Sequence, residues 1–146
     1  AQTVKALAEA ETWPGPSLIV AYSTCIAHGI DMSTSMSHQA EAVKSGFWPL
    51  WRYDPRMAVE GQRPMQLDSK EPTMPLREFQ SKEARFAMLA RSSPERYSQL
   101  QGLAQTDAEE RRRLYEQRAG VERHAPGRSE DRGDERAPAD TEGVQT

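Results

Sequence analysis

Hydrophobic positions in the first quarter of the chain follow a helical pattern and then a strand-like one. The first dozen residues place Val4, Leu7 and Ala8 at i, i+3 and i+4, which is typical of an amphipathic helix. The stretch WPGPS at residues 13–17 ends this helix. The run SLIVAY that follows is continuously apolar, as expected for a strand covered on both faces of a parallel sheet.

A second helix and a second strand follow this run. Residues 33–46, STSMSHQAEAVKSG, have serines near the helix start and Gly46 where a C-terminal cap belongs. Residues 47–54, FWPLWRYD, predict a strand, with Pro49 favouring an edge because proline lacks an amide donor. Strand, helix and strand predict a βαβ unit with a right-handed crossover. The expected fold class is therefore α/β, with a partial parallel sheet whose other strands lie elsewhere.

The pattern changes after residue 54. The stretch from residue 54 to residue 79 is rich in proline and charge, and it predicts an extended arm with one short strand at MQLD. Two or three C-terminal helices follow, at residues 81–92, at residues 93–103 with Pro94 in the first position, and at residues 106–120, where TDAE has capping-box spacing. Beyond His124 the composition predicts disorder.

Composition allows only a modest core. The 146 residues have room for about one domain, but 36% are hydrophobic and 28% charged, with ten prolines. Residues 126–146 hold three arginines and six acidic residues, which account for the whole net charge of -3. The absence of a basic stripe and a pI near 5.7 argue against a nucleic acid partner. Short apolar runs predict no membrane span and no signal peptide, and a single cysteine fits a reducing compartment such as the cytosol.

Cys25 is the only cysteine, and it lies just past the first predicted strand. Open α/β sheets bind ligands at that rim. One alternative is that Cys25 is a small buried hydrophobe. With His28 it has the spacing of half a zinc site, but His38 lies on a predicted helix and His124 in the tail. A catalytic set of Cys25, His28 and Asp31 is a third alternative, although three residues so close in sequence rarely form a triad.

Other residue clusters have simpler interpretations. The aromatic residues of 47–53 favour sheet packing over base stacking, and no phosphate-binding loop is present. The arginine run 111–113 beside Glu109 and Glu110 predicts a solvated helix face with ion pairs, and a docking patch for an acidic redox partner is the alternative. The chain begins at Ala1 within a helical pattern. We expect a piece of a longer polypeptide, with removal of an initiator methionine as the alternative.

Three blocks in order, GPSLIVAYSTCIAHGIDM, AVKSGFWPLWRYDPR and PMQLDSKEP, resemble the C-terminal end of pyruvate:ferredoxin (flavodoxin) oxidoreductases. The resemblance runs from Gln2 to about Gly120. It implies a large thiamine diphosphate enzyme that oxidatively decarboxylates pyruvate and forms acetyl-CoA with coenzyme A. It further implies that electrons pass singly through [4Fe–4S] clusters to ferredoxin or flavodoxin.

The same resemblance implies a role for Cys25 as the last ligand of the [4Fe–4S] cluster nearest the thiamine, with three cysteines upstream of this chain. Gly29 would let the backbone approach the cluster, and Ser23 and Thr24 would supply hydroxyl donors or shape the turn. The G-D-G motif that holds thiamine diphosphate and Mg²⁺ in the family is absent from this sequence. We therefore expect no catalytic residue in the chain.

The resemblance divides the chain into three parts. Residues 1–54 would end the thiamine diphosphate-binding domain, residues 55–122 would form the arm and helical segment, and residues 123–146 would be a disordered acidic tail. The expected function is that of a C-terminal fragment, inactive alone, of a cytoplasmic enzyme that is typically a homodimer. The alternatives are a separately encoded non-catalytic remnant and a helical protein-interaction module built on residues 79–120.

Overall fold

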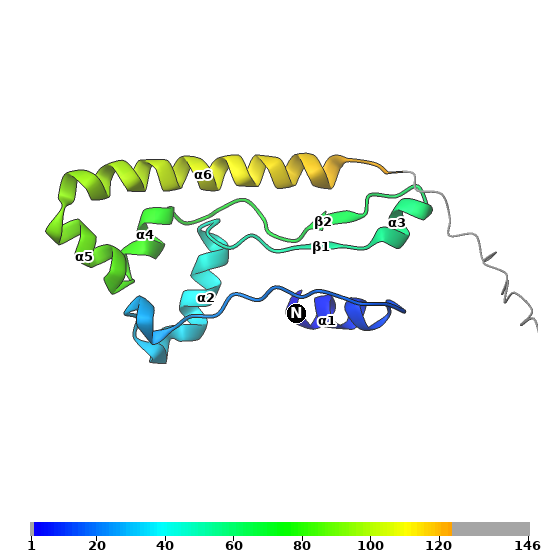
Figure 1. Ribbon diagram of the computed structural model, residues 1–146, viewed down its shortest axis with the longest axis horizontal. Helices are drawn as coiled ribbons and strands as arrows, with labels where there is room; N and C mark the ends of the chain where they lie inside the picture. Colours follow the sequence, from blue (N-terminus) through cyan, green and yellow to red (C-terminus); the bar gives the residue numbers. More distant parts are fainter. Residues whose placement is uncertain (1, 124–146) are drawn as a thin grey trace, which may run out of the picture.

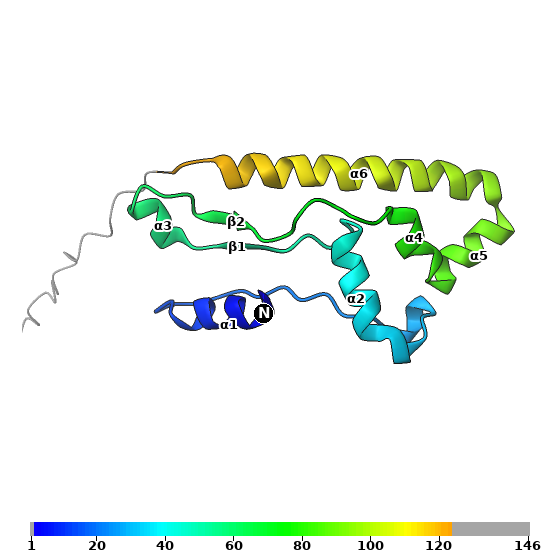
Figure 2. The same cartoon turned by 180° about the vertical axis from the view of Figure 1, so that it is seen from behind.

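The computed structural model describes residues 2–123, whose helices and one short sheet form an elongated molecule (Figure 1). The helices are α1 (Gln2–Glu11), α2 (Ser35–Lys44), α3 (Pro55–Val59), α4 (Leu76–Ser81), α5 (Ala84–Ser92) and α6 (Pro94–Gly120), with 3₁₀ turns η1 (Ile26–His28) and η2 (Met32–Thr34) and strands β1 (Trp51–Tyr53) and β2 (Met65–Leu67). Helix α6 runs along one side of the two strands and α1 along the other, in Figure 1 and from behind in Figure 2. Residues 124–146, which make up nearly all of the predicted tail, lie outside the described residues.

The sheet is antiparallel, so the predicted parallel βαβ unit is wrong. Strand β1 pairs with β2, with Trp51 opposite Leu67. Residues 17–22, predicted as the first strand, have no strand partner within the described part of the chain. The antiparallel pairing has a local cause. Helix α3 and a turn at Gly61, where φ is 70°, reverse the chain and bring β2 directly beside β1. Helices with a small sheet still agree with the α/β class, and the short strand predicted at MQLD is confirmed.

Buried apolar side chains gather where α2, α4 and α6 meet. The core residues are Ala42, Leu76, Phe79 and Ala108. Phe79 is fully buried, and its ring centroid lies 4.9 Å from that of Phe47. Phe47 therefore packs onto a helical core. The sequence had predicted sheet packing for the aromatic residues of 47–53, and Phe47 does not follow that prediction. This core holds in place the segment that comes before α2, because Tyr22 also packs against it.

Helix α6 is one continuous helix through the point where two helices were predicted to meet. The hydroxyl of Thr106, expected to cap a new helix, donates to the carbonyl of Gly102 at 3.2 Å inside the helix. Glycine costs only about 1 kcal/mol against alanine in a helix interior, so Gly102 alone does not end the helix. The predicted start at Pro94 is confirmed, as is the position of Gly46, whose φ of 73° suits the residue directly after the C-cap of α2, Ser45.

The arginine run of α6 holds this helix to the loop before β1 and to the loop after β2. Arg111 Nη2 donates to the Phe47 carbonyl at 3.1 Å, and Arg112 Nη1 donates to the Lys70 carbonyl at 2.7 Å. Only the side chain of Arg113 is mostly exposed, at 63%, and it pairs with a glutamate of the same helix. Two of the three guanidinium groups thus make internal contacts, which the prediction of a solvated face did not anticipate.

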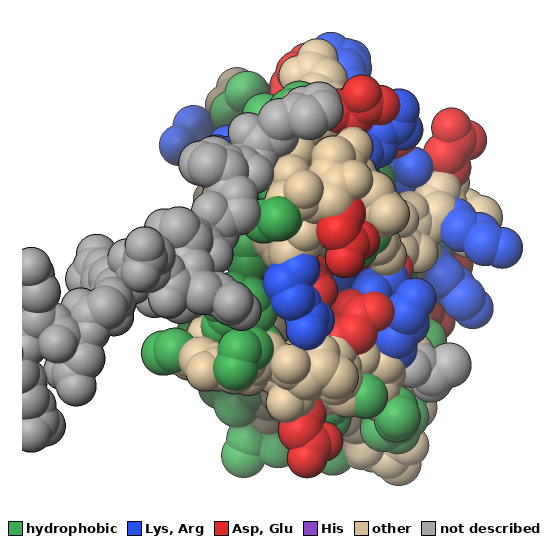
Figure 3. Space-filling model, turned by 90° about the vertical axis from the view of Figure 1, so that its right-hand side faces the viewer, with side chains coloured by type: hydrophobic (Ala, Val, Ile, Leu, Met, Phe, Trp, Pro, Cys, Tyr) green, Lys and Arg blue, Asp and Glu red, His purple; other side chains and the backbone are tan. Residues whose placement is uncertain are grey.

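Helix α1 has no buried residue and is held to the strands by polar side chains. Arg52 on β1 forms an ion pair with Glu9 of α1 and another with Asp68, where Nε and Oδ2 are 2.7 Å apart. Gln2 donates to the same Asp68 carboxylate at 3.0 Å. Figure 3, an end view, shows apolar side chains gathered at the bottom, the level of α1. No helix within residues 2–123 has the length and apolar composition of a membrane span.

Candidate functional site

The segment before Cys25 is held by an aromatic contact and by a hydroxyl pair. The Tyr22 ring centroid lies 5.8 Å from that of Phe47 and 5.5 Å from that of Trp48. Thr24 is buried, and its hydroxyl is hydrogen-bonded to the hydroxyl of Ser35, the first residue of α2. Of the two roles considered for Thr24, this contact favours shaping of the turn.

Cys25 is exposed in the described structure, which argues against the alternative of a small buried hydrophobe. The residue has extended backbone angles and lies at the N-cap of η1, where its Sγ accepts a hydrogen bond from the Ala27 amide at 3.4 Å. Hydrogen bonds to sulfur tune iron–sulfur centres. The turn therefore presents an accessible sulfur with a donor already in place.

Gly29 ends η1 in the left-handed conformation, with φ of 71°. Its carbonyl accepts the amide of Ala84 at 3.0 Å, and a Cβ at Gly29 would lie only 2.3 Å from the Cβ of Ala84. The sequence suggested that glycine here allows a close approach to a cluster. The structure gives two other reasons, namely the positive φ and the tight contact with the first residue of α5.

The alternative catalytic set of Cys25, His28 and Asp31 is not assembled by the structure. The Asp31 carboxylate accepts bonds from the amide and the hydroxyl of Ser33 at 2.9 Å and 2.7 Å, and these bonds lower the pKa of Asp31. His28 Nδ1 is buried and has no hydrogen-bond partner among the described residues. In residues 2–123, no side-chain hydrogen bond joins His28 to Cys25 or to Asp31. The geometry therefore does not support a catalytic triad.

Metal-ligating side chains are too dispersed to enclose an ion. Within residues 2–123, no group of three or more His, Cys, Asp and Glu residues is placed to hold a metal. His38 is buried against other residues, and His124 lies outside the described residues. The exposed Cys25 sulfur and its amide donor nevertheless fit a single thiolate ligand of an iron–sulfur cluster, which needs further cysteines from elsewhere.

A buried hydrogen-bonded pair beside the Cys25 turn has no signal in the sequence. His38 on α2 is 3% exposed and Glu83 is 0% exposed, and the His38 Nε2 to Glu83 Oε1 distance is 2.9 Å. The imidazole ring of His38 stacks on Phe79 at a centroid distance of 4.5 Å, and Arg85 pairs with the second oxygen of Glu83. The two residues of the pair are 45 positions apart, so no local pattern could have joined them.

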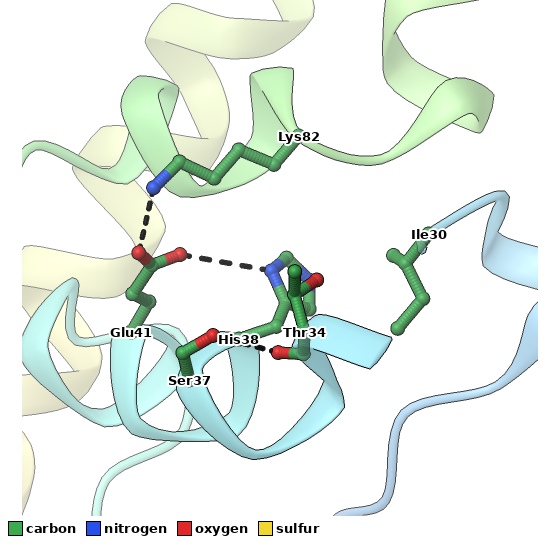
Figure 4. Close-up of a pocket in the computed structure, with 6 residues that line it drawn as sticks. All are labelled: Ile30, Thr34, Ser37, His38, Glu41 and Lys82. Atoms are coloured by element: carbon green, nitrogen blue, oxygen red, sulfur yellow. Dashed lines mark hydrogen bonds and ion pairs between the residues drawn. The ribbon is translucent and has the colours of Figure 1, made fainter. Parts of the chain in front are cut away.

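A small cavity of about 170 Å³ lies between this pair and the turn. It is lined by Ile30, Thr34, Ser37, His38, Glu41 and Lys82. In Figure 4 the Lys82 ammonium meets the Glu41 carboxylate, at 2.6 Å, and Glu41 in turn faces His38 Nδ1 at 3.8 Å. Ile30, which follows Gly29, lies on the opposite side of the cavity from Glu41 and Lys82.

Comparisons with known proteins match about four fifths of the chain. It is 52% identical over 115 residues to a Synechocystis sp. protein whose name places it among pyruvate-flavodoxin oxidoreductases. It is 48% identical over 120 residues to the pyruvate-flavodoxin oxidoreductase of Trichormus variabilis, and 46% identical over 118 residues to the pyruvate:ferredoxin oxidoreductase of Moorella thermoacetica. The matches cover 79%, 82% and 81% of this chain, respectively.

The same matches cover 10% of each relative. The chain therefore spans about a tenth of the length of the curated relatives it matches. No protein-family model matches the chain.

Proposed function

The chain is homologous to a segment of the pyruvate-flavodoxin and pyruvate:ferredoxin oxidoreductases, and from this premise we propose that it donates the Cys25 sulfur to a [4Fe–4S] cluster of such an enzyme. The whole enzyme would oxidise pyruvate to acetyl-CoA with thiamine diphosphate and coenzyme A. Flavodoxin or ferredoxin would accept the electrons in the cytoplasm. The segment itself contributes binding and orientation, with residues 1–54 as the end of the thiamine diphosphate-binding domain and residues 55–122 as the arm.

The observation that carries this proposal is the exposure of Cys25 on a turn that is otherwise well held. Thr24 is buried immediately before it, whereas Cys25 itself is exposed. A cysteine that only filled space would be expected to turn its sulfur inward, since free cysteine is among the most buried residue types. An outward sulfur with an amide donor at 3.4 Å is suited to an external ligand.

The residues around the sulfur have separate tasks in this proposal. A bound [4Fe–4S] cluster would supply one-electron transfer. The Ala27 amide donates a hydrogen bond to the Cys25 sulfur, and such bonds tune the potential of a bound cluster. Gly29 ends the turn in the left-handed conformation, and its carbonyl accepts the Ala84 amide, which holds the turn against the start of α5. None of these residues takes part in the decarboxylation.

Replacement of Cys25 by serine in the complete oxidoreductase tests the proposal. A hydroxyl is a poor substitute for a soft thiolate ligand, so we expect Cys25→Ser to lose or degrade one cluster. The measurements are the iron content per protein and the low-temperature electron paramagnetic resonance spectrum. The matched control is Ile26→Ser, which places the same side chain at a neighbouring residue that is 73% exposed. Full iron content and an unchanged spectrum in Cys25→Ser would refute the assignment.

A further inference from the structure

The Cys25 turn is attached to the rest of the molecule at two points, one on each side of the cysteine. On the N-terminal side, the Thr24 hydroxyl is hydrogen-bonded to the hydroxyl of Ser35 at the start of α2. On the C-terminal side, the Gly29 carbonyl accepts the amide of Ala84 at the start of α5. The position of the sulfur therefore depends on how α2 and α5 are placed relative to each other.

Helices α2 and α5 are joined by the buried pair of His38 and Glu83. His38 lies one helical turn after Ser35, and Glu83 is the residue directly before Ala84. The Nε2 to Oε1 distance is 2.9 Å, and neither side chain is more than 4% exposed. Each member of the pair is thus within three residues of one of the two attachment points of the turn.

The charges around the pair are balanced. Glu41 and Glu83 carry two negative charges, and Lys82 and Arg85 carry two positive charges, each in an ion pair with one of the carboxylates. His38 lies between the two carboxylates, with Nε2 facing Glu83 and Nδ1 facing Glu41. Loss of either side chain of the His38–Glu83 pair would leave the buried nitrogen or oxygen of the other without this hydrogen-bond partner, which is destabilising.

We propose that His38 and Glu83 are positioning residues that hold the Cys25 sulfur at the place required by the cluster. This inference rests on the proposed function, in which Cys25 is a cluster ligand. Residues that orient a metal ligand without touching the metal strongly affect the affinity for the metal. The pair acts here at one remove from the cysteine, because the Ala84 amide and the Ser35 hydroxyl are the groups that hydrogen-bond the turn.

Two substitutions of His38 separate its hydrogen bond from its packing. His38→Phe retains a ring that can stack on Phe79 but removes the donor to Glu83. His38→Gln removes the ring but keeps an N–H donor. If positioning depends on the hydrogen bond, His38→Gln will resemble the unaltered enzyme more closely than His38→Phe does. If it depends only on packing, the order will be reversed and the proposal is overturned.

Glu83→Gln provides the second test, with Glu71→Gln as a matched control on an exposed side chain. Both are measured in the complete oxidoreductase by iron release to a chelator and by the midpoint potential of each cluster. For Glu83→Gln we expect iron release about 10- to 100-fold faster than in Glu71→Gln, as is typical for outer partners of metal ligands. The potential of one cluster should shift while those of the others stay unchanged, which a general loss of stability would not produce.

The outcomes distinguish the two proposals. Retention of the cluster in Cys25→Ser refutes the proposed function itself. Loss of the cluster in Cys25→Ser, together with identical behaviour of Glu83→Gln and Glu71→Gln, leaves the proposed function standing and overturns the positioning role. If Glu83→Gln does not assemble, the comparison of His38→Phe with His38→Gln decides in the same way.

Discussion

Arg52 should be the main contact that keeps α1 on the strands. Its side chain is 10% exposed and forms two hydrogen bonds to the Asp68 carboxylate, at 2.7 Å and 2.8 Å, together with an ion pair to Glu9. The perturbation is Arg52→Met, which keeps much of the volume but removes every donor. Helix α1 has no buried residue, so no buried apolar side chain of α1 compensates for the lost polar contacts.

The expected cost follows from the exposure of each partner. The Asp68 side chain is 20% exposed, and a charged hydrogen-bonded pair in such a place contributes about 1.5–3 kcal/mol. The Glu9 side chain is 39% exposed, so solvent screening limits its pair to about 1 kcal/mol or less. Arg52→Met should therefore lower the free energy of unfolding by about 3 kcal/mol. Arg52→Lys keeps the charge but not the planar fork, and should lose about half of that amount.

The effect of Arg52 depends on pH in a defined direction. The side-chain hydrogen bonds from Arg52 lower the pKa of Asp68. A carboxyl group with a lowered pKa stabilises the folded state fully above its ordinary pKa of about 3.9, and this stabilisation is lost as the pH falls through the lowered value. The difference between the unaltered chain and Arg52→Met should therefore be largest near pH 7 and should shrink in acid.

Urea denaturation followed by circular dichroism measures the free energies, and amide hydrogen exchange of residues 2–11 reports on α1 itself. The control is Arg113→Met, which removes an exposed ion pair on α6 and should change stability by no more than about 0.5 kcal/mol. The reasoning is refuted if Arg52→Met is as stable as Arg113→Met, or if its deficit is the same at pH 7 and pH 3.

Two further predictions concern the turns. Gly29→Ala should destabilise the chain by about 3 kcal/mol, since it combines a positive φ with an overlap against Ala84, and Ala84→Gly in the same chain should restore only the part due to the overlap; urea denaturation of both variants checks this. Asp54→Ala removes the cap on the Arg56 amide and should cost about 1 kcal/mol at pH 7. Because Arg56 lowers the pKa of Asp54, that cost should diminish as the pH falls below about 4, which denaturation at several pH values measures.

Local signals in the sequence predicted local structure well. Proline at position 94 and glycine at position 46 marked a helix start and a helix end correctly, because each acts through its own backbone angles. The signal at Thr106 was misleading. A capping box stabilises a helix start only where the preceding residues leave the helix, and here they remain helical.

Contacts between distant positions could not be predicted in the same way. The apolar run at residues 18–22 indicated a strand, but periodicity carries no information about the partner, and β1 pairs instead with the strand that returns beside it. His38 and Glu83 are 45 positions apart, and a glutamate in a charged stretch gives no sign that it will be fully buried. For the candidate site, the sequence therefore identified Cys25 but not the pair beside its turn.

The contacts that hold the Cys25 turn do not involve the Cys25 side chain outside the turn itself. The attachments are made by Thr24 and Gly29, and the only hydrogen bond that the described structure gives to the sulfur comes from Ala27 within η1. A serine oxygen can accept that same amide, so Cys25→Ser should leave the turn in place. Loss of a cluster in this variant would then reflect loss of a ligand, whereas loss of a cluster in Glu83→Gln would reflect movement of a ligand that is still present. The two variants therefore test metal binding and positioning separately.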